Sequence, residues 1–166
     1  MKRFVVLLFC LLAFLLCTPS VYASSAFDAD YELDYSVAPS GITIVTQKVT
    51  LTNKETNLYP RQYEVIIDTE KIQNILARDV AGLITPTITK KDGKTTIGLL
   101  FNEQVVGLGK QLTFTIRYDN LDIAAKNGSI WEVYVPGVAD DESLKTYIVS
   151  LSVPPSFGPV AYRSPA

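Results

Sequence analysis

The protein has 166 residues, of which 48% are hydrophobic, and a formal net charge of −2. This length and composition allow one ordinary hydrophobic core and exclude a disordered chain. The mild acidity, without a basic stripe, argues against phosphate-backbone binding, so we expect no nucleic acid partner.

Residues 1–23 have the features of a secretory signal peptide. Lys2 and Arg3 precede an unbroken apolar run over residues 4–17, and small residues lead up to Ala23. The run is shorter than the roughly 20 residues that a membrane-spanning helix needs. We therefore predict cleavage after Ala23 and a secreted or cell-surface protein, which meets the membrane only through this peptide before cleavage.

The processed chain is expected to lack the side chains of the common catalytic sites. Both cysteines, Cys10 and Cys17, lie in the predicted signal peptide, and the sequence contains no histidine. Zinc sites, Cys-His nucleophiles and Ser-His-Asp triads need these residue types. We predict no catalytic, cofactor-binding or metal-binding residue, no cofactor, and no enzyme activity for this chain.

Alternation of apolar and polar residues predicts strands in the first half of the chain, at residues 28–37, 63–68 and 72–77. In residues 42–51, the apolar set changes face between Ile44 and Val45, which predicts a β-bulge near Ile44. Residues 85–101 hold Asp92-Gly93 between two β-rich runs. Because glycine reaches positive φ freely, this pair predicts a tight hairpin turn.

Three segments of the second half alternate in the same way: residues 112–119, 130–135 and 147–153. Each is expected to lay one apolar face on a core. Between the first two, residues 122–126 form the one segment suited to a helical turn. From Pro154 onward, prolines and glycines accumulate, which ends the sheet and begins an extended linker.

These elements predict an all-β protein, an antiparallel, immunoglobulin-like β-sandwich of about eight strands preceded by a signal peptide. The predicted organisation is a signal peptide over residues 1–23, a β-sandwich domain over residues 24–155, and a Pro-rich linker or truncated end over residues 156–166.

Two acidic clusters are candidate sites. Asp28, Asp30, Glu32 and Asp34 share one strand face and could hold Ca²⁺, but their spacing along a strand favours a solvated outer face. The cluster of Asp140, Asp141 and Glu142 precedes a predicted strand. Paired carboxylates can perform acid-base catalysis as in glycosidases, yet an ordinary polar loop is the favoured interpretation.

Aromatic side chains offer a second kind of candidate site. Trp131 is the only tryptophan, and its alternation with Val133 favours a core position over a binding platform. Tyr59, Tyr134 and Tyr162 fall outside the predicted core pattern and are better candidates for surface contacts.

Glycines mark two further motifs. Gly107 and Gly109 lack the spacing and helix of a phosphate-binding loop and predict a turn. Asn127-Gly128-Ser129 matches the glycosylation acceptor pattern, but Asn127-Gly128 is better explained as a turn.

Four segments, read in order, resemble a known arrangement: DYELDYSVAPSGITIVTQKVTLTN, VVGLGKQLTFTIRYDN, NGSIWEVYVP and YIVSLSVPPSFGPVAYRSP. They resemble the N-terminal β-sandwich of exported bacterial transglutaminase-like proteins, in which β domains precede a papain-like Cys-His-Asp module. The resemblance implies that a C-terminal catalytic domain follows in the same polypeptide and that this sequence is a fragment. The family's cysteine and histidine have no counterpart here, so no catalytic residue is carried over.

We therefore expect a non-catalytic, secreted or cell-surface accessory or spacer domain of a larger transglutaminase-like protein. One alternative is a module that binds an envelope polysaccharide or envelope protein through exposed tyrosines. A second is a carboxylate-dependent or metal-dependent hydrolase, which requires acidic residues of separate segments to converge in a pocket.

Overall fold

The computed structural model describes residues 25–137 and 143–163. These residues form an all-β structure, as predicted, without an α-helix and with one 3₁₀ turn, η1. The elements are, in chain order, β1 (Phe27–Val37), β2 (Thr43–Asn53), β3 (Gln62–Ile67), β4 (Ile72–Asp79), β5 (Leu83–Ile84), β6 (Thr87–Lys91), β7 (Lys94–Leu100), β8 (Gln111–Asn120), β9 (Ala124–Asn127), β10 (Ile130–Val133), β11 (Leu144–Ser152) and η1 (Pro155–Phe157).

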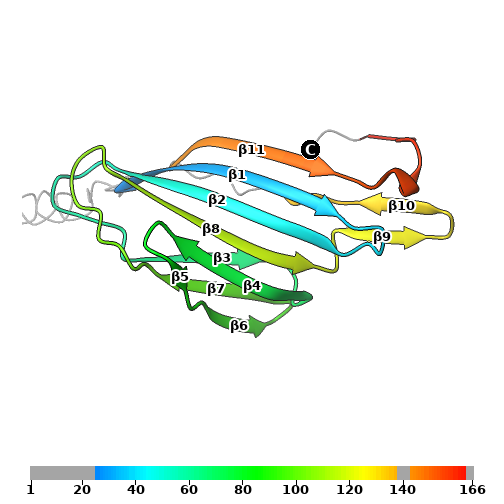
Figure 1. Ribbon diagram of the computed structural model, residues 1–166, viewed down its shortest axis with the longest axis horizontal. Coiled ribbons are helices and arrows are strands. Elements are labelled where there is room, and N and C mark those ends of the chain that lie inside the picture. Colours follow the sequence, from blue (N-terminus) through cyan, green and yellow to red (C-terminus); the bar gives the residue numbers. More distant parts are fainter. Residues whose placement is uncertain (1–24, 138–142, 164–166) are drawn as a thin grey trace, which may run out of the picture.

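The strands form two packed layers and a small hairpin (Figure 1). The larger sheet has the strand order β11-β1-β2-β8-β4-β5, and the smaller sheet has the order β3-β7-β6. The β9–β10 hairpin lies at one end of the sandwich. Neighbouring strands are antiparallel, except that β11 runs parallel to β1 at the edge of the larger sheet.

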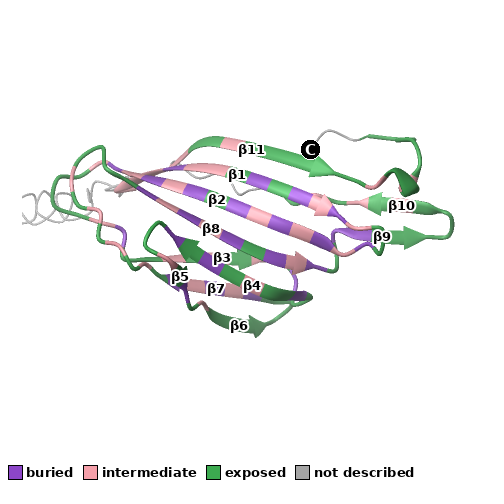
Figure 2. Ribbon diagram, viewed as in Figure 1, coloured by how far each residue is buried: buried purple, intermediate pink, exposed green. Residues whose placement is uncertain are grey.

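The core lies between the two sheets. Residues of β8 alternate between buried and partly exposed, so that Phe114 and Ile116 point inward with almost no exposed surface (Figure 2). They belong to one cluster with Val49 of β2 and with Ile97 and Leu99 of β7. This packing is what the alternation in β8 predicts, because successive side chains of a strand point to opposite faces.

The predicted bulge near Ile44 is wrong. The β1–β2 pairing keeps one register from Phe27 opposite Asn53 to Val37 opposite Thr43. The apolar residues seemed to change face because β2 places Gln47 on the inner face, where it is 8% exposed, and Ile44 on the outer face. The register shifts in the described residues lie elsewhere: one in β4 next to Asn74, whose φ is 54°, and one in the β1–β11 pair between Ala29 and Asp30.

The predicted hairpin at Asp92-Gly93 is confirmed. Both residues have positive φ, 53° and 77°, and they connect β6 to β7 with Lys91 opposite Lys94. Positive φ at both central residues is the geometry of a type I′ turn, whose twist suits a hairpin. By contrast, residues 122–126, the segment suited to a helical turn, hold none, since β9 begins at Ala124.

The C-terminal strand differs most from its prediction. Residues 147–153 were expected to lay one face on a core, but most of β11 is exposed on both faces, including Val149 and Leu151. Beyond it, η1 forms within the segment predicted as a linker. The predicted signal peptide and the cluster of Asp140, Asp141 and Glu142 lie outside the described residues. In the part of the chain that the structure describes, no helix is long and apolar enough to span a membrane.

Candidate functional site

The candidate site with the most defined geometry lies at the end of the sandwich that carries the β9–β10 hairpin. The two strands are joined by Gly128 and Ser129, and Gly128 has a φ of 63°. Asn127-Gly128 is thus part of a turn, as predicted. The hairpin presents Trp131 and Val133 toward the molecule and Ile130 toward solvent.

Trp131 connects this hairpin to the C-terminal segment. Its ring stacks on Phe157 of η1 with a centroid distance of 4.1 Å and an interplanar angle of 5°. The ammonium of Lys126 lies 5.9 Å from the centroid of the same ring, within the range of a cation–π interaction. Trp131 is therefore half-buried by a local aromatic contact, and the prediction that it belongs to the core cluster is wrong.

Gly41 closes the other approach to the tryptophan. It lies in the turn between β1 and β2, and a Cβ added there would come within 2.8 Å of Trp131 Cζ3. Its φ of 90° is also a conformation that side chains disfavour. Both the clash and the positive φ require glycine at this position. Three segments of the chain therefore meet at the indole ring: the β1–β2 turn, the β9–β10 hairpin and the segment that holds Phe157.

The tyrosines predicted to form surface contacts do not form one platform. Tyr134 and Tyr162 are strongly exposed, at 71% and 84%, whereas Tyr59 is half-buried. The β2–β3 connection that holds Tyr59 lies at the end of the molecule opposite β9 and β10 (Figure 1). Among the described residues, the contacts between aromatic rings involve none of the three.

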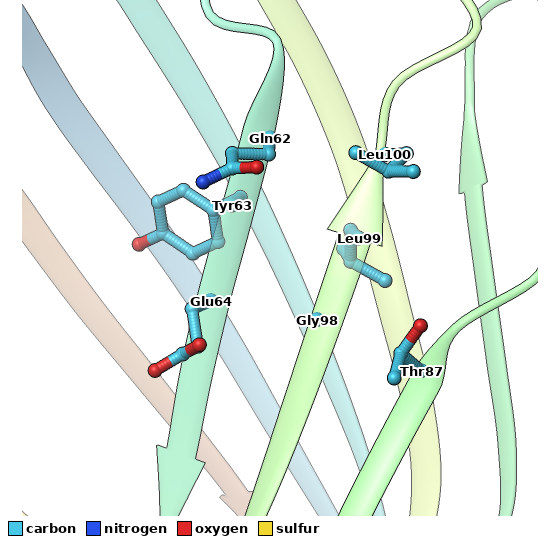
Figure 3. Close-up of a pocket in the computed structure, with 7 residues that line it drawn as sticks. All are labelled: Gln62, Tyr63, Glu64, Thr87, Gly98, Leu99 and Leu100. Atoms are coloured by element: carbon cyan, nitrogen blue, oxygen red, sulfur yellow. The ribbon is translucent and has the colours of Figure 1, made fainter.

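A shallow depression of about 430 Å³ lies on the smaller sheet (Figure 3). It forms where Gly98 of β7 leaves a gap between the side chains of Glu64 on β3 and Thr87 on β6. A second depression of about 330 Å³ lies beside β11 on the larger sheet, and Glu32, Lys48 and Ile148 line it. Both are open surface hollows, and two acidic residues of β1, Glu32 and Asp34, line the second.

The acidic face of β1 lies on the outer side of the larger sheet, where it was predicted. Asp28 lies 3.3 Å from the ammonium of Lys54 and 3.6 Å from that of Lys145, and Glu32 lies 3.1 Å from that of Lys48. These lysines pair with two of the four carboxylates of this face, those of Asp28 and Glu32. Among the residues that the structure describes, no group of three or more acidic, histidine or cysteine side chains is placed to hold a metal ion.

Asp79 is a buried carboxylate that the sequence pattern did not single out. It is 3% exposed and accepts hydrogen bonds from the backbone N–H groups of Gly82 and Asn102, at 3.0 and 2.7 Å. Burial alone would raise the pKa of Asp79, but hydrogen bonds from Asn102 and Gly82 outweigh it and lower the pKa below its usual value. The arrangement fixes two loops, which is a structural role.

Tyr35 and Tyr118 are buried in the larger sheet, and the half-buried Tyr147 lies nearby. Burial, with Tyr147 nearby, raises the pKa of Tyr35 to about 12, and burial with Tyr35 and Tyr147 nearby raises the pKa of Tyr118 further. Val45 separates Tyr35 from Tyr118 across the larger sheet. A tyrosine of ordinary pKa, near 10, is already neutral at pH 7, so the role of Tyr35 and Tyr118 is to pack in the core.

The glycine pair before β8 is a turn, as predicted. Gly107 and Gly109 both have positive φ, and the N–H of Lys110 donates to the carbonyl of Gly107 at 3.1 Å. The N–H of Gly109 donates to the carbonyl of Asn53, which fixes this turn to the end of β2.

Sequence reasoning missed the partners of Trp131. Phe157 lies among prolines and glycines that predicted a linker, and Gly41 lies just before residues 42–51, with no pattern that points to Trp131. The signal in the sequence for this contact is that Phe157 is an aromatic residue within a segment rich in prolines and glycines. Comparison adds no further assignment: no family model matches the chain, and no curated protein matches it in sequence.

Proposed function

We propose that this chain is a non-catalytic accessory or spacer domain, exported to the cell surface, that holds a neighbouring module of a transglutaminase-like protein in a defined orientation. The observation that carries the proposal is the parallel stack of Trp131 on Phe157. A spacer that orients its neighbour needs a fixed exit for the chain, and this stack attaches the segment after β11 to the end of the sandwich.

The residues around the stack support this assignment. Phe157 belongs to a 3₁₀ turn that starts after Pro154, whose φ of −70° and ψ of 145° are extended. Prolines restrict the backbone of this segment, and the stack removes the remaining freedom at one point. An inter-module connection built in this way transmits orientation rather than acting as a flexible tether.

The orientation proposal is tested by fusing a small, rigid reporter domain after Ala166 and measuring residual dipolar couplings of both parts. We expect the reporter to share an alignment frame with the sandwich in the wild type. Phe157→Ala should reduce this shared alignment, whereas Val160→Ala, at a position that is 75% exposed, should leave it unchanged. Equal alignment in all three proteins would contradict a role for the stack.

The transglutaminase-like context has a separate test. The coding sequence beyond Ala166 should continue in frame and encode a cysteine and a histidine for the papain-like module. A stop codon at that position would contradict the predicted catalytic partner, while the orientation experiment would still report on the exit segment.

A further inference from the structure

The outer edge of β11 differs from the other sheet edges in the described residues. An edge strand exposes unpaired N–H and C=O groups, and proteins protect such edges with charges, prolines or very short strands. The edge strand β5 has two residues, and β6 ends in Lys90 and Lys91. Strand β3 carries Glu64. Each of these edges therefore has a device against pairing.

Strand β11 has no such device over most of its length. After Lys145, the segment of residues 146–153 contains neither a charged residue nor a proline. Its register with β1 shifts once, at Lys145, between the pairs Ala29–Leu144 and Asp30–Thr146, and from Thr146 to Ser152 the pairing is regular. β-Branched and other apolar residues alternate with serine there, which is a pattern suited to strand pairing.

Apolar side chains on both faces of this edge are exposed. Val149 and Leu151 share the inner face with Leu33 and Tyr35 of β1, yet they are 39% and 45% exposed. Ile148, on the outer face beside Glu32, is 53% exposed. The smaller sheet reaches as far as β1, where the hydroxyls of Tyr63 and Tyr31 are in contact. The inner face of β11 extends beyond this cover.

We propose that β11 pairs with β11 of a second copy of this chain, antiparallel about a two-fold axis, so that two larger sheets join edge to edge. Self-pairing suits this segment, because Val149 and Leu151 lie on one face and can be set against each other, and residues 146–153 carry no charge that would meet its like. An axis at Ser150 puts Val149 opposite Leu151 on the inner face. It also puts Ile148 opposite Ser152 on the outer face.

This pairing completes the hydrogen bonds of both exposed edges and covers apolar side chains on the inner face. The contact involves one strand from each copy, so its area is small for a stable dimer and the association is expected to be concentration-dependent. The pairing is isologous, and it therefore closes at two copies rather than forming a filament.

The test uses residues 24–166, which contain the whole core cluster and no cysteine. Sedimentation equilibrium should show a mass that doubles as concentration rises. Leu151→Lys should raise the dissociation constant at least tenfold, because it introduces a charge opposite an apolar partner. Ile66→Lys, a matched change at a 60% exposed position on the edge strand β3, should leave the dissociation constant unchanged. Circular dichroism confirms that each variant is folded.

An independent readout places the axis. In the proposed register, Ser150 lies opposite its own copy, and residues directly opposite in an antiparallel pair have Cα atoms roughly 4.5–5.5 Å apart. That spacing falls within the roughly 4.4–6.8 Å of disulfides. Ser150→Cys should therefore form a disulfide-linked dimer under mild oxidation, and Ser129→Cys, in the distant β9–β10 turn, should not.

Three results would overturn the proposal. The wild-type chain could remain monomeric up to millimolar concentration, which would leave the edge for a different partner or for none. Ile66→Lys could weaken the dimer as much as Leu151→Lys, which would place the contact elsewhere. Ser150→Cys could cross-link no faster than Ser129→Cys, which would exclude the two-fold pairing of β11.

Discussion

Strands β8 and β11 have nearly the same pattern in sequence and opposite environments in the structure. Both alternate apolar and polar residues, yet Phe114 of β8 is 1% exposed and Leu151 of β11 is 45% exposed. Strand β8 has β2 and β4 as neighbours, and its inner face meets the smaller sheet. Strand β11 has β1 on one side only. Alternation thus predicts the faces of a strand, while the neighbouring elements decide whether a face is covered.

The largest expected effect is at the centre of β8. Phe114 packs against Tyr63 and Phe101, each with a centroid distance of 4.9 Å. Phe114→Ala should lower the free energy of unfolding by about 3–5 kcal/mol, because it leaves a cavity in the core. Urea denaturation followed by circular dichroism measures the change. A loss below about 1 kcal/mol would mean that the two sheets are not packed as described.

The next effect concerns the end of the sandwich, where an aromatic contact replaces sheet packing. Gly41→Ala should cost about 2–4 kcal/mol, since it combines a disfavoured positive φ with a clash against Trp131. Gly109→Ala is the matched control, because its φ is 72° and no atom lies within 4 Å of the added Cβ. The fluorescence of Trp131, the only tryptophan, should change in the first variant alone. Equal losses in both variants would show that the indole does not restrict position 41.

A smaller effect is expected at Asp79, the buried polar neighbour of Phe114 in the β4–β8 pair. Asp79→Ala should lower the free energy of unfolding by about 1–3 kcal/mol at neutral pH, since the donors on Gly82 and Asn102 lose their acceptor. Asp34→Ala, on the exposed outer face of β1, should change it by less than about 0.5 kcal/mol.

The contribution of Asp79 should depend on pH. Its folded-state pKa is lowered, so the stabilisation is fully present above the unfolded-state pKa of about 3.9 and is lost as pH falls through the folded-state value. The difference between the wild type and Asp79→Ala should therefore shrink in acid. A difference in the free energy of unfolding that stays constant as the pH falls well below the unfolded-state pKa would contradict this prediction.

The smallest effect on stability is expected at β11. Leu151→Ala should cost less than about 1 kcal/mol in a dilute, monomeric sample, because much of the side chain is already exposed. Measured beside Phe114→Ala by the same denaturation, it tests the contrast between the two strands directly. A loss comparable to that of Phe114→Ala would mean that β11 is covered within a single copy.

Local chemistry made several features predictable. The turn at Asp92-Gly93 needs only residues that accept positive φ, and the alternation in β8 places its own core residues. The bulge prediction at Ile44 failed because a buried glutamine, Gln47, takes an inner position that polarity assigns to the surface. The role of Trp131 was missed since Phe157 and Gly41 are distant in sequence and carry no pattern that links them.

The sequence by itself determined that this protein is built of strands, where most of them lie and which face of each is apolar, because side-chain alternation and turn chemistry act between neighbouring residues. Only the tertiary structure decided the parallel placement of β11 beside β1, the docking of the C-terminal segment on Trp131 and the exposure of an uncharged edge. These features depend on contacts between segments far apart in the chain, and strand alternation is the same whether or not such a contact forms.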